Sequence, residues 1–385
     1  MSCRDFSTSE FAQRREALTE QLHRNKIDWF IAIHPRSIHW LTGSRAKSYQ
    51  SFQCLFVSAA GGLPVLIARR SDQLELEADA LVKEIRFWGD SQVPDAETAL
   101  VRAFGDLRLR GRTLALDQPD HFPGTDLFQS LVRRHGAKTL NGTALLRDVR
   151  LIKSPAEQKY IRKAGEIADL SMAALQDGLR IGKTELSLTG NIYQAALQAG
   201  GDLPASPINI AAGARGLFCH AAPSERPVRD KDHGNAEYAV PYRGYPASIG
   251  RQFCIGQPAQ ALTDTLGYVK EALQAAILGC TSGVPARDVF FSANEVLKRH
   301  GLDQARAHTM GYAMATAFPP AMGETFQIAP DNHEPLRSGM QFSICPNVFS
   351  PKANLGVRLV NNILVHDTAA EVVTRFPLDL IEARS

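Results

Sequence analysis

The residue whose surroundings most suggest chemistry is Glu237, a single acidic side chain in an otherwise apolar stretch. The stretch, residues 234–251, reads GNAEYAVPYRGYPASIGR and contains two segments of alternating apolar residues, Ala236–Val240 and Tyr245–Ile249. Pro241, Arg243 and Gly244 lie between them, which predicts a β-hairpin with the turn at these residues.

A buried carboxylate is costly unless it is paired or has a chemical role. We therefore expect Glu237 to lie at the centre of an active site without metal. The alternative is that Glu237 is structural and pairs with Arg243 or Arg251 across the hairpin.

The whole chain has the composition of a globular protein large enough for two domains. It has 385 residues, 44% of them hydrophobic and 22% charged, and a formal net charge of +3. That charge is too small to suggest a nucleic-acid partner, and no apolar run approaches the roughly 20 residues of a membrane span. The N-terminus lacks the basic-then-apolar pattern of a signal peptide. The six scattered cysteines form no C-x-x-C pair, which favours reduced thiols and a cytoplasmic location.

The first 150 residues alternate helical and strand patterns, which predicts an α/β domain. The expected helices cover residues 10–28, 72–81 and 125–135. The expected strands cover residues 29–34, 53–58, 63–68 and 113–116, the second and third of them paired.

A second domain, residues 151–385, begins with a strong helix-start signal. Ser154 can cap the helix, Pro155 suits its first position and Glu157 completes a capping box. The apolar stripe is expected at Ile161, Ala164, Ile167 and Leu170. Further helices are expected at residues 185–198, 263–278 and 284–300, and strands near 342–345 and 357–365.

Five motifs in order resemble the creatinase and aminopeptidase P family. IHWLTG resembles its N-Y-L-T-G strand end, and RLIKSPAEQKYIRKA resembles its domain junction. GYPASIGRQFCIG resembles a G-Y-x-x-D-x-x-R-T-F hairpin, LRSGMQFSICP resembles L-x-P-G-M-x-x-x-x-E-P, and GVRLVNNILV resembles G-x-R-x-E-D-x-x-L-V. The resemblance covers essentially the whole chain. It implies a creatinase-type α/β N-terminal domain followed by an α+β pita-bread catalytic domain.

The family's metal-binding pattern is not kept. Its peptidases hold two metal ions with two Asp, one His and two Glu. The resemblance places these on Glu237, Ser248, Tyr312 (or, in a second register, His308), Cys345 and Val360. Hard divalent ions need several carboxylates, so a dinuclear metallopeptidase is not expected. We expect no cofactor.

The resemblance is nearest to the metal-free members, which include creatinase and ectoine hydrolase. Ectoine hydrolases have G-Y-P-I-G-L-S-Y-P-P-D-W-G-E-R-T where this chain has GYAMATAFPPAMGET, residues 311–325. They also carry a Glu at the Glu237 position and a D-x-x-E-L-x-P-G-M run, comparable with Asp331, Glu334 and LRSGM. Their G-Y-D-G-W-S-F-Y loop is GSRAKSYQ here and lacks the Trp.

A hydrolase without metal needs a base, an acid or a covalent nucleophile. Glu237 could attack an amidine carbon or deprotonate water. His220 lies 17 positions earlier (237 − 220), where the family places its substrate-side His, and it could protonate the leaving nitrogen. The alternative for His220 is a surface loop histidine. Tyr312 could orient the substrate or merely fill the space of the metal ligand.

Other candidates are assigned to substrate binding or to structure. Ser248 and Cys345 are substrate-binding candidates, and Glu324 could bind a cationic amidinium or be an exposed turn carboxylate. Arg251 is expected to brace a strand carboxylate. Cys219 neighbours His220, but neighbours on a strand point to opposite faces, so Cys219 and Cys345 are expected to be inert buried thiols.

In creatinase-like dimers, an N-domain loop reaches the partner's pocket and binds the substrate carboxylate. The resemblance therefore implies a homodimer in which Arg45, Lys47 and Tyr49 complete the partner's site. The alternative is a solvated basic loop.

The leading hypothesis is a metal-independent hydrolase that opens a C–N bond in a small zwitterionic amidine, guanidino or amide compound. One alternative is a catalytically dead binding protein on a peptidase scaffold. Others are a mononuclear metal enzyme using His308, Glu237 or His220, or an Xaa-Pro-type aminopeptidase with an altered metal site.

Overall fold

The structure is a computed structural model that describes residues 5–45, 51–117, 125–306, 309–319 and 321–383. The chain divides into two compact units, Met1–Arg150 and Leu151–Ser385. No helix in the described part of the chain is long and apolar enough to span a membrane.

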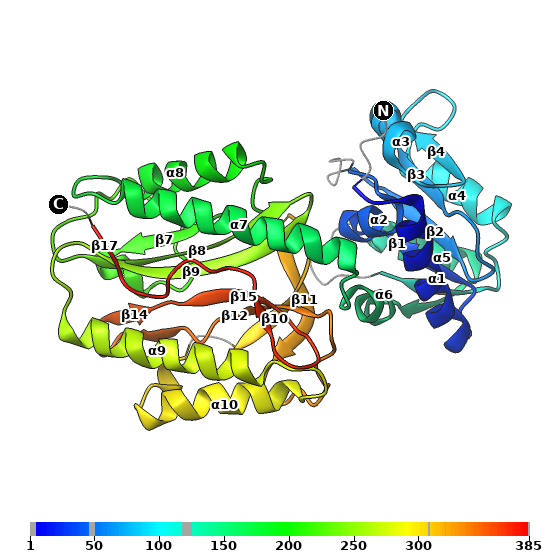
Figure 1. The fold of residues 1–385 in the computed structure, drawn as a ribbon. Coiled ribbons are helices and arrows are strands. Elements are labelled where there is room, and N and C mark those ends of the chain that lie inside the picture. The colour runs from blue at the N-terminus through cyan, green and yellow to red at the C-terminus, as the bar shows by residue number, and fades with distance from the viewer. Residues whose placement is uncertain (1–4, 46–50, 118–124, 307–308, 320, 384–385) are drawn as a thin grey trace. The chain divides into compact units, whose positions relative to one another are not determined.

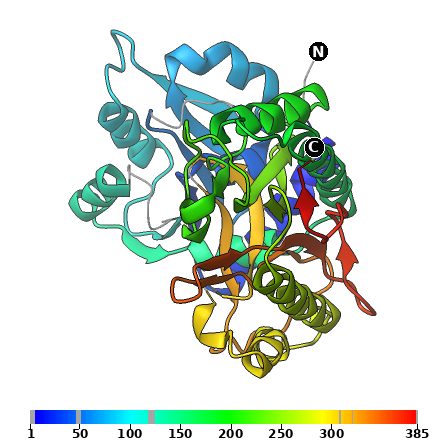
Figure 2. The ribbon, with the colours of Figure 1, turned by 90° about the vertical axis from the view of Figure 1, so that its left-hand side faces the viewer.

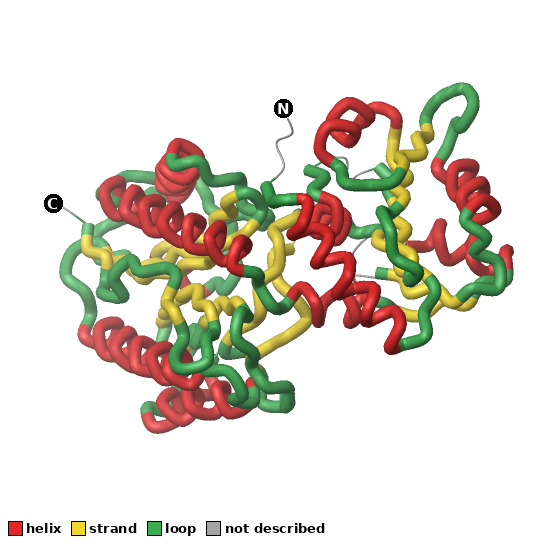
Figure 3. The backbone as a smooth tube through the Cα atoms, turned by 45° about the vertical axis from the view of Figure 1, so that its right-hand side comes forward, coloured by secondary structure: helices red, strands yellow, loops and turns green. Residues whose placement is uncertain are grey.

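The N-terminal unit is a six-stranded sheet, over its described residues, with helices on both faces (Figure 3). Strand order is β4-β3-β2-β1-β5-β6, with β1 antiparallel to β2 and parallel to β5. The strands are β1 (Trp29–Ala32), β2 (Cys54–Ser58), β3 (Val65–Arg69), β4 (Glu84–Trp88), β5 (Thr113–Leu116) and β6 (Lys138–Asn141). The helices are α1 (Thr8–Arg24), α2 (Pro35–Thr42), α3 (Gln73–Asp79), α4 (Ala96–Asp106), α5 (Thr125–His135) and α6 (Thr143–Arg150).

One predicted feature of this unit is wrong. The IHWLTG segment was compared with a strand end, but it lies in helix α2. His34 caps the helix by accepting a hydrogen bond from the Arg36 amide, and Pro35 occupies the first turn, where its missing N–H costs nothing. Gly43 ends the helix in the left-handed conformation, with φ of 81°.

The C-terminal unit is a mostly antiparallel sheet with two helix pairs packed on one of its faces, each pair over its own half of the sheet (Figures 1 and 2). The main strand order is β11-β10-β12-β15-β9-β8-β7, and β16 and β17 pair with β15 and β9. The helices are α7 (Pro155–Gly178), α8 (Glu185–Gln198), α9 (Gln260–Gly279) and α10 (Ala286–Arg299). The strands are β7 (Asn209–Ala212), β8 (His233–Tyr242), β9 (Tyr245–Cys254), β10 (Gly311–Phe318), β11 (Ala321–Ile328), β12 (Gln341–Ile344), β13 (Val348–Ser350), β14 (Leu355–Val357), β15 (Val360–Leu364), β16 (Glu371–Val372) and β17 (Ile381–Glu382).

Helix α7 begins at the predicted capping box, in which Ser154 and Glu157 bind each other's backbone amides. Ile161, Ala164 and Ile167 are buried, but Leu170 is 56% exposed, so that part of the predicted stripe is wrong. Each residue of an α-helix is rotated by about 100° from the one before it. Leu170, nine residues after Ile161, therefore lies on the opposite side of the helix.

The predicted hairpin is present and longer than expected. Strands β8 and β9 pair from His233 with Cys254 to Tyr242 with Tyr245. The two-residue turn is Arg243-Gly244, whose φ angles of 50° and 82° fit the type I′ geometry that matches strand twist. Pro241 was expected in the turn but is paired with Pro246 within the strands.

Side chains along these strands alternate between the helix-covered face and the opposite face. Ala236, Tyr238 and Val240 pack in the cluster with α7 and α8, so Glu237 and Ala239 point away from it. On β12, Phe342 and Ile344 pack towards α9 and α10, which leaves Ser343 on the other side. The alternation thus brings polar side chains together on the face without helices.

Candidate active site

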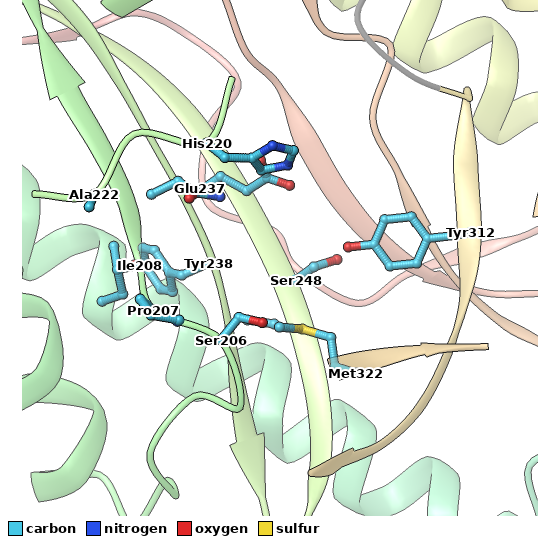
Figure 4. Close-up of a pocket in the computed structure, with 12 residues that line it drawn as sticks. Ser206, Pro207, Ile208, His220, Ala222, Glu237, Tyr238, Ser248, Tyr312 and Met322 are labelled. Carbon is cyan, nitrogen blue, oxygen red and sulfur yellow. The ribbon is translucent and has the colours of Figure 1, made fainter. Parts of the chain in front are cut away.

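Four of the predicted site residues line one cavity of about 330 Å³ (Figure 4). They are Glu237, His220, Tyr312 and Ser248. Ser206, Pro207, Ile208, Asn209, Ala222, Tyr238, Ala239 and Met322 complete the described lining. The volume is within the range of small-molecule sites.

Glu237 is paired with Arg358, which sequence reasoning missed. Arg358 Nη1 lies 2.9 Å from Glu237 Oε2, and the exposed fractions of the two side chains are 0% and 17%. The N–H is not aligned for a hydrogen bond, and Arg358 Nε has no hydrogen-bond partner among the described residues. The guanidinium therefore lies at ion-pair distance from the carboxylate, while Glu237 still lines the cavity.

The arginine paired with Glu237 is thus neither Arg243 nor Arg251, so the partners predicted for a structural Glu237 are wrong. Arg251 is fully buried and donates to backbone carbonyls, including those of Phe376, Pro377 and Val360. Arg251 therefore holds backbone carbonyls in place, whereas we predicted that it would bind a carboxylate side chain. Burial lowers the pKa of its guanidinium to about 10.

Ser248, which lines the cavity near Tyr312, belongs to a chain of neutral hydrogen-bonding groups. Ser248 Oγ donates to Ser343 Oγ at 2.8 Å, and Asn362 Nδ2 lies 3.3 Å from Ser248 Oγ. Figure 4 shows the Tyr312 hydroxyl directed towards Ser248. Burial and then the neighbouring Glu237 charge raise the pKa of Tyr312 well above its usual value, so the phenol stays protonated and can donate.

His220 lies in a turn directly after the short helix η2 (Gly213–Leu217), rather than on a strand. The alternating-face argument about Cys219 and His220 therefore does not apply. Arg358 Nη2 donates to the Cys219 carbonyl and lies 3.5 Å from its Sγ. The guanidinium that pairs with Glu237 thus also holds the residue before His220.

Cys345 and Glu324 do not occur among the described lining residues. Cys345 is 5% exposed, and burial raises the pKa of its thiol far above the usual value, as expected of an inert cysteine. Burial also raises the pKa of the Cys219 thiol. Glu324 is 8% exposed and lies within β11, so it is not an exposed turn carboxylate.

In the N-terminal unit, Arg45 Nε lies 3.2 Å from the buried carboxylate of Asp5. The Arg45 side chain is also 37% exposed, so it is partly solvated as well as paired. Lys47 and Tyr49 lie outside the described residues, as does His308.

The family's dinuclear metal site does not fit these side chains. Of the five corresponding positions only Glu237 is a carboxylate, and a guanidinium already neutralises it. Val360 is fully buried and packs on Gly250. Within the described residues, no three His, Cys, Asp or Glu side chains are grouped to hold an ion.

The fold and cavity define a two-domain protein with a creatinase-type N-terminal domain and a pita-bread C-terminal domain. Residues 159–367 match the metallopeptidase family M24 and residues 14–152 match the creatinase/prolidase N-terminal domain. The chain belongs to metallopeptidase family M24.

Its relatives include proteins named for different substrates. It is 23% identical to the ectoine hydrolase of Halomonas elongata, covering 97% of this chain and 98% of the relative. It is 27% identical to the probable dipeptidase PepE of Mycobacterium tuberculosis, covering 99% of each.

Solved structures confirm the fold. The prolidase of Thermococcus sibiricus has a TM-score of 0.88 at 23% identity, covering 98% of this chain and 100% of that one. The dipeptidase PepE of Mycobacterium ulcerans has a TM-score of 0.84 at 24% identity, with the same coverage.

Proposed function

We propose that this M24-family hydrolase cleaves a C–N bond of a small amidine, guanidino or amide metabolite without using a metal ion. One observation carries the proposal: a carboxylate held by a buried arginine faces a small cavity lined by a histidine and a tyrosine. Similarity to ectoine hydrolase supports this substrate class, whereas similarity to M24 dipeptidases supports the alternative of a peptide substrate.

The lining residues favour a cationic or neutral reacting group. The described lining contains one acidic side chain, Glu237, and no lysine or arginine. A carboxylate accepts charge-assisted hydrogen bonds from an amidinium or guanidinium, which directs the reacting carbon to the catalytic groups.

In the proposed reaction, Glu237 either takes a proton from the water that adds to that carbon, or itself adds to the carbon to form an ester-like intermediate. In the second route a water molecule then hydrolyses the intermediate and frees Glu237. His220 gives a proton to the nitrogen as its bond to carbon breaks. In both routes the products together contain the substrate and one water molecule. Tyr312, a neutral donor, stabilises the charge that develops on the oxygen or nitrogen doubly bonded to the attacked carbon.

The test is turnover of ectoine, creatine and an Xaa-Pro dipeptide by the wild-type protein and by Glu237→Gln. We expect a non-peptide compound to be hydrolysed and the variant to lose about 100- to 10,000-fold in kcat while remaining folded. Asp202→Asn is the control, because Asp202 binds the Gly244 amide at the hairpin turn and does not occur in the described lining.

Near-normal turnover by Glu237→Gln would overturn the mechanism. Hydrolysis of the dipeptide alone would favour the peptidase alternative. A compound that raises the melting temperature but yields no product would favour a binding protein, the alternative suggested by the loss of metal ligands.

A further inference from the structure

The chain segment that carries His220 is anchored by Glu185, a residue that the proposed reaction does not use. Glu185 is the first residue of α8, and its side chain is fully buried. Its Oε1 accepts a hydrogen bond from the Ala212 amide at 3.0 Å. Its Oε2 accepts from the Ser224 amide at 3.0 Å and from the Ser224 hydroxyl at 2.7 Å. One carboxylate therefore joins the two ends of segment 212–224.

Arg215 extends this anchor towards His220. Its Nη1 lies 2.7 Å from Glu185 Oε2, and its Nη2 donates to the Ala222 carbonyl at 2.6 Å. Ala222 is two residues after His220 and lines the same cavity. The ion pair thus fixes the main chain on the C-terminal side of His220, while Arg358 holds the Cys219 carbonyl on the N-terminal side.

The start of α8 also binds the far end of the segment. The amides of Glu185 and Leu186 donate to the carbonyls of Arg226 and Ser224, at 3.2 and 3.1 Å. The first amides of a helix have no carbonyl acceptor within the helix, so these two contacts supply their hydrogen-bond partners. The position of the segment is therefore set by the helix end rather than by the turn itself.

We propose that Glu185 is a positioning residue that fixes the turn bearing His220 against the cavity. The proposal rests on the proposed function, in which His220 is the proton donor. A small misplacement of such a group lowers the rate without removing any reacting atom, and about 1 Å can cost about 100-fold.

The first test needs no substrate. In Glu185→Gln the charge that holds Arg215 is lost, so we expect amide hydrogen exchange in residues 213–223 to speed up by about tenfold or more. Exchange in α9 and α10 should stay unchanged. The control is Glu157→Gln, which alters another buried carboxylate, one that binds the Ser154 amide and the Tyr245 hydroxyl, both at 2.8 Å. Unchanged exchange in residues 213–223 of Glu185→Gln would overturn the proposal.

The second test asks whether Glu185 acts through His220. We expect Glu185→Gln to lower kcat by about 10- to 100-fold with little change in KM, and to have almost no further effect in His220→Ala. Glu157→Gln should have the same small effect in both backgrounds. Equal losses from Glu185→Gln with and without His220 would show a merely structural role.

The two proposals fail in different ways. If His220→Ala keeps full turnover, the proposed function is wrong about the proton donor, whatever Glu185 does. If His220→Ala is impaired but Glu185→Gln is not, the catalytic role of His220 stands and the positioning role of Glu185 is wrong.

Discussion

Among the individual side chains, the Glu237–Arg358 pair does most to set the chemistry of the cavity. Arg358 is fully buried, so its charge acts through little solvent, and Glu237 is its close carboxylate partner. Phe349 lies beside the guanidinium, with its ring centroid 5.2 Å away. The arginine supplies fixed positive charge beside Glu237, the position at which the resemblance to the family places a metal ligand.

Arg358→Met should destabilise the protein strongly, because it leaves the largely buried Glu237 carboxylate without its cation. We expect the free energy of unfolding at neutral pH to fall by about 3–5 kcal/mol, measured by urea denaturation. The double variant Arg358→Met/Glu237→Gln should recover part of this loss. Equal stability of the single and double variants would show that the pair is not energetically coupled.

Tyr312→Phe removes the neutral donor near Ser248 and leaves the ring in place. We expect kcat to fall by about 100-fold with the fold unchanged, since a hydroxyl that stabilises a developing anion is worth that much. Tyr245→Phe is a matched control, because its hydroxyl donates to Glu157 at 2.8 Å and Tyr245 does not occur in the described lining. If both variants keep wild-type kcat, Tyr312 only fills space.

Part of the site could be predicted from residue type and motif position. Glu237, His220, Tyr312 and Ser248 do meet in one cavity. Arg358 was missed, although it lies in the GVRLVNNILV motif, because 121 residues (358 − 237) separate it from Glu237. Glu237 lies on β8 and Arg358 lies just before β15. These two strands flank β9 in the sheet, which the order of residues in the sequence does not show.

Among the helices and strands, the sequence predicted correctly those elements that are marked by a strong local motif. The α7 capping box and the β8–β9 hairpin depend on neighbouring residues and were found. Helix α2 was missed because eight residues with alternating polar and apolar side chains are too few to distinguish a short helix from a strand. His220 is exposed in a turn, as the loop alternative describes, and the position of that turn could not be predicted because it depends on Glu185 and Arg358, which are distant in sequence.

Strand β16 is tied to α7 by an ion pair whose strength depends on pH. Arg162 Nε and Nη2 each lie 2.8 Å from an oxygen of Glu371, and the bonds from Arg162 are the main reason that the pKa of Glu371 is lowered. A carboxyl group with a lowered folded-state pKa adds stability above its unfolded pKa and loses it as pH falls through the folded value.

We therefore expect Glu371→Gln to cost about 1 kcal/mol at neutral pH, a modest value because Arg162 is partly exposed to solvent. The difference from wild type should shrink as pH falls below 4.5, the ordinary pKa of this group. Urea denaturation at several pH values measures it. A difference that is constant down to acidic pH would contradict the assignment.

At the level of the whole molecule, the expected homodimer stays a prediction. Light scattering of the intact protein should then give twice the subunit mass of 42.1 kDa. A mass of one subunit would remove the basis for a shared site that uses Arg45.

The central claim is that hydrolysis depends on Glu237 and not on a bound metal ion. Its most direct test is the turnover rate of wild-type protein before and after removal of metal, with the metal content measured in the same samples. We predict that the metal-free protein hydrolyses its C–N substrate at the untreated rate and that added divalent ions do not raise it. Loss of turnover with the metal, and its return when a divalent ion is restored, would contradict the account.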